Sequence, residues 1–190
     1  MTTPNEICQE NTPEVWRQLR DNSLRWTTLD LSRQNGLNQD GLEGLTQALV
    51  GNTVVAALYL EENHLTDVEP LCELLAAGSN RTALTVLDLG ANRIDNQGAE
   101  QLARALQTNT TLSELYLNNN MIGEKGAQAL LDTLMGPNKT LSVLDLGGNN
   151  ISNELHAKLD SVSQLQQKQT GWVKHKYHVA STTHLIRGTA

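Results

Sequence analysis

One pattern recurs five times along the 190-residue chain and restricts its fold more than any other feature. Three copies read L-x-x-L-x-L-x-x-N-x-I, at residues 84–94, 112–122 and 141–151. A copy at 55–65 starts with Val55, and a copy at 26–37 starts with Trp26, has Gln34 in the asparagine slot and carries one inserted residue. The copies start at 26, 55, 84, 112 and 141, so the steps are 29, 29, 28 and 29 residues. This period indicates an array of stacked structural units.

Each unit combines a strand pattern with a helix pattern. Leu87 and Leu89 alternate with polar residues, which is the period of a short strand with one buried face. Apolar residues then follow at the i, i+3, i+4, i+7 spacing of one helix face: Ala99, Leu102, Ala103 and Leu106. One such unit cannot bury its own apolar side, so the units must stack. We therefore expect a parallel sheet on the concave side and helices on the convex side.

An asparagine recurs where the chain leaves each later strand: Asn63, Asn92, Asn120 and Asn149. Its side-chain amide can donate and accept hydrogen bonds at once, so we predict that it ties each turn to the neighbouring one. A glycine marks the expected entry to three of the helices: Gly41, Gly98 and Gly126.

These units resemble leucine-rich repeats. Their length and helical second half are similar to the ribonuclease-inhibitor-type class, which is also found in NLR-type immune receptors. The resemblance covers roughly residues 24–160. It implies an α/β fold, a right-handed β/α solenoid of five 28–29-residue repeats with the sheet on the concave face, and a surface that binds proteins. The chain departs from ribonuclease inhibitor, which is longer, rich in cysteine, and alternates cysteine with asparagine at the turn.

Three segments are expected: an N-terminal capping helix at 1–23, five repeats at 24–160, and a basic C-terminal cap or tail at 161–190. Thr12 and Pro13 suit a helix start, and Val15, Trp16 and Leu19 form an apolar stripe behind them. All three tryptophans (16, 26 and 172) lie near the ends, where they can cover the core. Residues 161–190 contain four Lys or Arg and no Asp or Glu. Three interpretations of this tail remain open: residues 172–179 seal the fifth repeat, the tail serves partner binding or localisation, or it is disordered.

We expect the partner-binding surface on the concave face, because residues between and after the strand leucines point away from the core. The candidates are Asp30, Arg33, Tyr59, Glu61, Glu62, Asp88, Glu114, Tyr116, Asn118 and Asp145. Tyrosine is frequent among residues that dominate binding energy, and charge mainly sets on-rate and specificity. An acidic face with two tyrosines predicts a protein partner with a basic surface. The alternative is that the aspartates only keep the sheet soluble.

No pattern of residues predicts catalysis or a bound cofactor. Asp30, Asp88 and Asp145 would lie roughly 10 Å apart on an open sheet, with ordinary pKa values. His156, His175, His178 and His184 fit no zinc template, so no metal is expected. Cys72 lies between helix leucines and is interpreted as a core residue. Asn80, Asn109 and Asn138 head N-x-T sequons that belong to the repeat.

Charge and cysteine content suggest the compartment and the kind of partner. The chain has 14 Lys and Arg against 21 Asp and Glu, a net charge of −7, which disfavours nucleic acid. Two cysteines make no disulfide framework, and no signal peptide or membrane span is recognisable. We therefore expect a cytoplasmic monomer, or alternatively a bacterial effector delivered into the host cytosol.

The leading functional hypothesis is an adaptor or recognition module that binds a protein, in an immune-type or pathogen–host setting. The alternative is a regulator of an enzyme in trans, such as the Ran GTPase-activating proteins, whose repeats resemble these. An enzyme in its own right is the third hypothesis, which the missing catalytic constellation disfavours.

Overall fold

A computed structural model describes residues 13–23, 27–33, 37–76 and 82–170. In these ranges, five three-residue strands alternate with helices along the chain. The elements are α2 (Pro13–Arg20), β1 (Thr28–Asp30), α3 (Gln39–Leu49), β2 (Ala57–Tyr59), α4 (Glu69–Ala76), β3 (Val86–Asp88), α5 (Asn96–Leu106), β4 (Glu114–Tyr116), α6 (Glu124–Met135), β5 (Val143–Asp145) and α7 (Asn153–Thr170).

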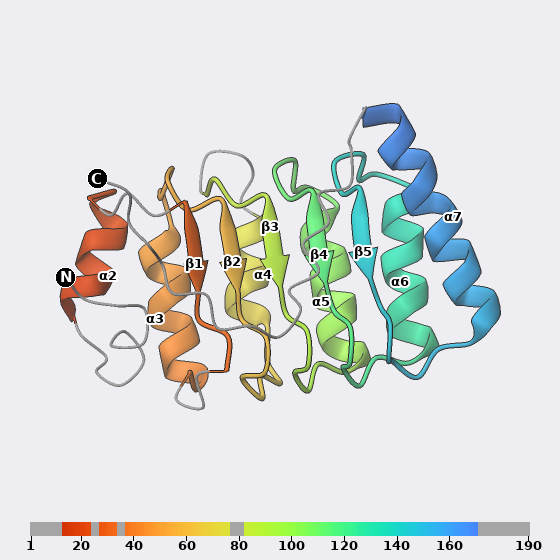
Figure 1. Cartoon of the computed structure of the whole chain (residues 1–190), viewed down its shortest axis with the longest axis horizontal. Helices are drawn as coiled ribbons and strands as arrows, with labels where there is room; N and C mark the ends of the chain where they lie inside the picture. The colour runs from red at the N-terminus through yellow and green to blue at the C-terminus, as the bar shows by residue number, and fades with distance from the viewer. Residues whose placement is uncertain (1–12, 24–26, 34–36, 77–81, 171–190) are drawn as a thin grey trace.

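The strands form one parallel sheet in chain order, β1-β2-β3-β4-β5. Equivalent repeat positions pair directly; Leu58 is opposite Leu87, and Leu87 is opposite Leu115. The strands stand side by side in one layer, and the helices cover one side of it (Figure 1). The predicted α/β solenoid is confirmed.

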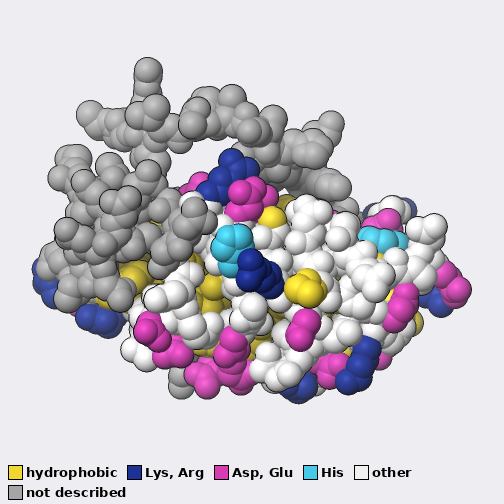
Figure 2. Space-filling view, turned by 90° about the horizontal axis from the view of Figure 1, so that it is seen from below, with side chains coloured by type: hydrophobic (Ala, Val, Ile, Leu, Met, Phe, Trp, Pro, Cys, Tyr) yellow, Lys and Arg dark blue, Asp and Glu magenta, His cyan; other side chains and the backbone are white. Residues whose placement is uncertain are grey.

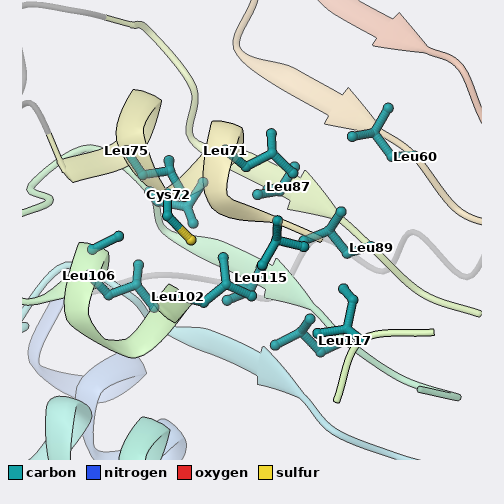
Figure 3. Packing of buried hydrophobic residues seen from close by; sticks show 14 of the residues in the cluster. Leu60, Leu71, Cys72, Leu75, Leu87, Leu89, Leu102, Leu106, Leu115 and Leu117 are labelled. Atoms are coloured by element: carbon teal, nitrogen blue, oxygen red, sulfur yellow. The ribbon is translucent and has the colours of Figure 1, made fainter. Parts of the chain in front are cut away.

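The core lies between the sheet and the helices. Leu87 and Leu115 are fully buried, and they pack towards the apolar faces of α4 and α5 (Figure 3). Cys72 lies within this leucine cluster, as its sequence position predicts, and burial raises the pKa of its thiol to about 12. Tight packing also explains Gly126 on α6, because a Cβ there would lie 2.8 Å from the Cβ of Ala99.

The turn asparagines tie adjacent repeats together, as predicted. Asn92 donates through Nδ2 to the Leu60 carbonyl (2.9 Å) of the preceding repeat. Its Oδ1 accepts the backbone N–H groups of Asn63 and Leu65, both at 3.0 Å. The same bond to the preceding repeat is made by three further amides: Asn63 to Leu31, Asn120 to Leu89 and Asn149 to Leu117. The amides add side-chain bonds to the backbone pairing that continues between the repeats past the strand ends.

The first helix packs at the N-terminal end of the array. In α2, Leu19 is fully buried and Trp16 is partly buried against the core. Trp16 lies close to α3, because a Cβ on Gly44 would be 3.5 Å from its indole nitrogen. The expected cap residues Thr12 and Trp26, and Gln34 of the first repeat, lie outside the described residues.

The last helix is longer than the others. It continues to Thr170, so the expected boundary at residue 160 falls inside α7. Gln166 donates through Nε2 to the Leu134 carbonyl at 2.9 Å, and Gln167 donates to the Ser142 carbonyl at 2.9 Å. These side chains bind carbonyl groups that a further repeat would otherwise use. The remainder of the expected tail, with Trp172 and residues 172–179, lies outside the described residues.

Candidate concave binding face

The register aligns five candidate residues across the sheet. Asp30 is opposite Tyr59, Tyr59 opposite Asp88, Asp88 opposite Tyr116 and Tyr116 opposite Asp145. We call these five residues the central row. Neighbouring strands lie about 4.8 Å apart, so successive side chains are within contact range. Because the intervening leucines point to the helices, the central row lies on the open side of the sheet.

Each aspartate of the central row also stabilises the turn at the end of its own strand through a side-chain hydrogen bond to the backbone. The Oδ1 atoms of Asp30, Asp88 and Asp145 accept the backbone N–H two residues later, at 3.0, 2.8 and 2.9 Å. Such a local turn favours Asp at this position whether or not a partner binds. The aspartates therefore have a structural role that the sequence interpretation did not identify. The tyrosines cannot make this bond.

Tyr116 is fixed by a second candidate residue. Its hydroxyl donates to Glu114 Oε2 at 2.7 Å on the same strand. Burial and this hydrogen bond raise the pKa of the Tyr116 phenol, so the hydroxyl stays protonated and remains a donor. The ring is therefore held in place as one rigid side of the central row.

The pKa of the Asp88 carboxyl group differs from the ordinary value expected from the sequence. The pKa of its carboxyl group is raised to about 6, chiefly by burial and also by the negative charges of Glu61, Asp145 and Asp30, although the hydrogen bond from the Gly90 N–H lowers it. No cation is paired with Asp88 among the described residues. The expectation of a normal pKa was wrong because it ignored desolvation at the middle of the sheet. This carboxylate would be stabilised by a cation.

Arg33, Glu61 and Glu62 form a separate group at one end of the face. The Arg33 guanidinium lies 3.3 Å from Glu62 and 3.8 Å from Glu61. Arg33 and Glu62 have positive φ values of 60° and 57°, so they belong to the turn after the strand. Figure 2 shows the molecule from below, with one cluster of basic and acidic side chains in contact at its surface. These charges partly neutralise one another.

Small residues lie beside the central row. Gly90 and Gly147 follow β3 and β5, and Asn118 follows β4 between them. A Cβ on Gly90 would lie 2.9 Å from the Asn118 side-chain oxygen, so the Asn118 side chain packs against the glycine. The ten candidates thus divide into the central row, the neighbouring Glu114 and Asn118, and the Arg33 group.

The sequence analysis assigned Asn109 and Asn138 to the repeat, but it did not predict that they form a second set of asparagines bonded between repeats, three residues before the first leucine of each unit. Asn109 and Asn138 are 3% and 2% exposed, and their Nδ2 atoms donate to the carbonyls of Leu75 and Leu106 at 3.0 and 2.7 Å. Asn52 donates in the same way to Leu19. The sequons at Asn109 and Asn138 are therefore part of the framework, because the atom that would carry a glycan is buried and bonded. Asn80 lies outside the described residues.

Other candidate chemistry is weaker. In the described part of the chain, no three His, Cys, Asp or Glu side chains group as metal ligands. His175, His178 and His184 lie outside it. A groove of about 470 Å³ lies between α5 and α6, on the opposite side from the central row. Its Lys125 and Glu100 pair with each other at 2.9 Å. None of the described helices combines the length and apolar character needed to cross a bilayer.

Comparison with known proteins agrees with this geometry. A family model described as "Leucine Rich repeat" matches residues 82–103, 108–131 and 138–154. The chain belongs to the leucine-rich-repeat family. Its repeats are of the ribonuclease-inhibitor type: ribonuclease inhibitor of Sus scrofa is 34% identical over 116 residues. A NACHT, LRR and PYD domains-containing protein 3 of Macaca mulatta is 30% identical over 135 residues.

These relatives are much longer than the matched region. The match covers 60% of this leucine-rich-repeat chain and 25% of the porcine inhibitor, and 68% of the chain and 13% of the macaque protein. A solved structure titled "Leiomodin-1 Actin-Binding Site 2 (ABS2)" superposes with a TM-score of 0.71 and 24% identity, over 83% of this chain and 90% of that one. At that identity the superposition supports the shared fold.

Proposed function

We propose that this leucine-rich-repeat chain recognises a partner protein through its concave face, and that the partner presents basic side chains there. The observation that carries the proposal is the central row, in which Tyr59 and Tyr116 flank Asp88 across adjacent strands. Relatives named ribonuclease inhibitor, and a similar structure titled as an actin-binding site, support protein binding as the activity of this fold.

The chemistry of the central row favours a lysine or arginine. A cation beside Asp88 relieves the repulsion from Glu61, Asp145 and Asp30 that helps to raise the pKa of Asp88. The rings of Tyr59 and Tyr116 offer apolar area and cation–π attraction to the same side chain. Tyr116 is held by Glu114, so little side-chain entropy is lost when a partner binds. The remaining acids speed association with a basic surface.

The role that follows is an adaptor or recognition protein, in an immune-type or pathogen–host setting. It acts as a cytoplasmic monomer without a cofactor. Catalysis in its own right is disfavoured, because members of this repeat family are generally binding modules and the central acids are separated by tyrosines. Asp88 lies opposite a tyrosine, and not an acid, on each neighbouring strand.

A second candidate is regulation of an enzyme in trans. Two of the relatives carry the name ribonuclease inhibitor, and they are 34% and 35% identical to this chain. The test is to add the chain to a purified ribonuclease and to a panel of GTPases and to measure turnover. A rate unchanged at saturating concentrations of the chain contradicts this candidate.

The main test compares two immobilised baits that differ only on the central row. The variant Tyr59→Ala/Asp88→Asn/Tyr116→Ala removes both rings and one charge. Asn at position 88 keeps a side-chain oxygen for the Gly90 N–H. Captured proteins are identified by mass spectrometry, and a ribonuclease and actin are added as defined probes because the relatives' titles name them.

The control variant Glu73→Gln removes one negative charge from an exposed position on α4. All baits must show the same circular dichroism, and the triple variant must unfold at a midpoint no lower than that of wild type. We expect partners that bind wild type and Glu73→Gln and are lost by the triple variant. Partners retained by the triple variant would place the site elsewhere and contradict the proposal.

A further inference from the structure

One side-chain amide on the concave face has no hydrogen-bond partner in the described part of the chain. The turn asparagines and the second set of asparagines all bond to backbone groups of the neighbouring repeats. Asn118 is partly buried, yet its side chain makes no hydrogen bond with any described residue. It follows β4 on the open side of the sheet, next to the strand that carries Asp88. An amide that is unpaired there can donate to a ligand and accept from it.

The side chains of Asn118 and Asp88 meet above Gly90. Sheet pairing continues past the strand ends, because the Ala91 N–H donates to the Asn118 carbonyl at 2.8 Å, and Gly90 is therefore opposite Asn118. A Cβ on Gly90 would lie 2.9 Å from Asn118 Oδ1 and 3.1 Å from Asp88 Oδ1. Two side-chain oxygens from adjacent strands thus flank the space above one glycine.

The backbone does not require glycine at position 90. Gly90 is not among the residues with positive φ. The equivalent positions of three other repeats carry side chains, namely Ser32, Glu61 and Asn118. A side chain at position 90 would occupy the space between the two oxygens. The glycine therefore matters for the room that it leaves on the face.

Asp88 is the only aspartate of the central row with such a neighbour in the described sheet. The corresponding residue beside Asp30 is Glu61, which already lies within ion-pair distance of Arg33. Asp145 is on β5, which is the last strand of the described sheet. The pair of a carboxylate and a free amide therefore marks one place on the face, above β3.

The two oxygens fit an ammonium group better than a guanidinium group. Asp88 Oδ1 already accepts the Gly90 N–H at 2.8 Å, so Oδ2 is the oxygen left for a ligand. Arginine binds best when both oxygens of one carboxylate face its planar fork. The lysine ammonium has three donors that point in different directions, so it can bond to oxygens on separate strands. The ring of Tyr116, held by Glu114, offers apolar surface to the lysine carbon chain.

We propose that Asp88 and Asn118 form a lysine subsite above Gly90, where the ammonium group of a partner lysine donates to Asp88 Oδ2 and Asn118 Oδ1. The carbon chain of that lysine packs against Tyr116. The subsite rests on the proposed function for its partner, and it makes Asn118 the residue that selects lysine over arginine. Loss of the Asn118 amide weakens lysine binding more than arginine binding.

The selection is tested with fluorescein-labelled decalysine and decaarginine, two probes of equal length and charge, by fluorescence anisotropy at neutral pH. The measured quantity is the lysine preference, which is the Kd of decaarginine divided by the Kd of decalysine. Asn118→Ala should lower this preference about three- to tenfold, because one hydrogen bond to a charged group is lost.

The matched control is Asn150→Ala. Asn150 is an exposed asparagine after β5, and its side chain also makes no hydrogen bond in the described structure. Its replacement should change the lysine preference less than about twofold. The subsite is refuted if Asn118→Ala stays within twofold of wild type, or if the control lowers the preference equally.

A double variant tests whether the two residues bind the same ammonium group. Asp88→Asn removes the charge and keeps a side-chain oxygen for the Gly90 N–H. In an Asp88→Asn chain, Asn118→Ala should change the lysine preference less than about twofold, because residues that share one ligand are not additive. An equal fall with and without Asp88 would contradict the shared subsite.

NMR of the ¹⁵N-labelled full chain locates the bound lysine. The side-chain amide signals of Asn118 are those missing from the spectrum of Asn118→Ala. They should shift saturably with decalysine, at the concentration where the anisotropy saturates. Signals that stay unchanged at saturation, or that shift equally with decaarginine, overturn the proposal.

The bait comparison on Tyr59, Asp88 and Tyr116 judges the proposed function separately. Partners lost by the triple variant, together with a lysine preference that Asn118→Ala leaves unchanged, would support the concave face and refute the subsite.

Discussion

The turn asparagine of the third repeat should carry an unusually large share of the stability for one polar side chain. Asn92 is 6% exposed, and its amide makes five hydrogen bonds, three as donor and two as acceptor. Replacement by alanine leaves the N–H groups of Asn63 and Leu65 without an acceptor. Each buried unpaired group costs about 1–3 kcal/mol, so for the two groups we expect Asn92→Ala to lower the free energy of unfolding by about 2–6 kcal/mol.

Urea denaturation followed by circular dichroism measures this change, and the slope with urea must match wild type for the comparison to hold. Asn118→Ala is the matched control, because no side-chain hydrogen bond of Asn118 is found in the described structure and it should cost less than about 0.5 kcal/mol. Asn92→Asp should destabilise at neutral pH as well, because a carboxylate would face three carbonyls. A loss below about 1 kcal/mol for Asn92→Ala would refute the reasoning.

Three further predictions concern the core and the acid–base groups. Leu115→Ala removes a fully buried strand leucine and should cost about 2–5 kcal/mol in urea denaturation; a change near zero would contradict the packing of β4. The pKa of Asp88 in the folded chain, about 6, lies above the ordinary aspartate value of 3.8, so its destabilising contribution develops as the pH rises from about 4 to 6. Asp88→Asn should therefore stabilise by about 1–3 kcal/mol at pH 7.5 and little at pH 3.5, and an equal difference at both pH values would contradict this account. Cys72, with a pKa of about 12, should resist a disulfide reagent in a Cys8→Ser chain until urea unfolds it; rapid labelling of the folded chain would refute its burial.

The repeat architecture could be predicted because it depends on periodic residues. Leu87, Leu115 and their equivalents fall every 28 or 29 residues, and each must face the helices for the units to stack. Asn92 was also interpretable, since an amide at a fixed place in each turn can bind both neighbours. Such positions repeat, and repetition makes their role visible in one sequence.

The properties of the concave face were harder to predict from the sequence, because they depend on contacts between residues of different repeats. The raised pKa of Asp88 comes from burial and from acids on other strands, which no local pattern reveals. The aspartates looked like binding residues although each also accepts a backbone N–H two residues later. Gln166 and Gln167 lie outside the strand and turn motifs, so their bonds to the preceding repeats became evident only once α7 was placed.

The central claim is that the partner binds across the central row, and tyrosine NMR tests it most directly. The chain has three tyrosines, and two of them, Tyr59 and Tyr116, lie on the central row. With ¹³C-labelled tyrosine and the variants Tyr59→Phe and Tyr116→Phe for assignment, a captured partner is titrated into the full chain. The account predicts saturable shifts of both ring signals at the concentration where binding saturates. A partner that saturates while both signals stay unchanged would show that it binds elsewhere.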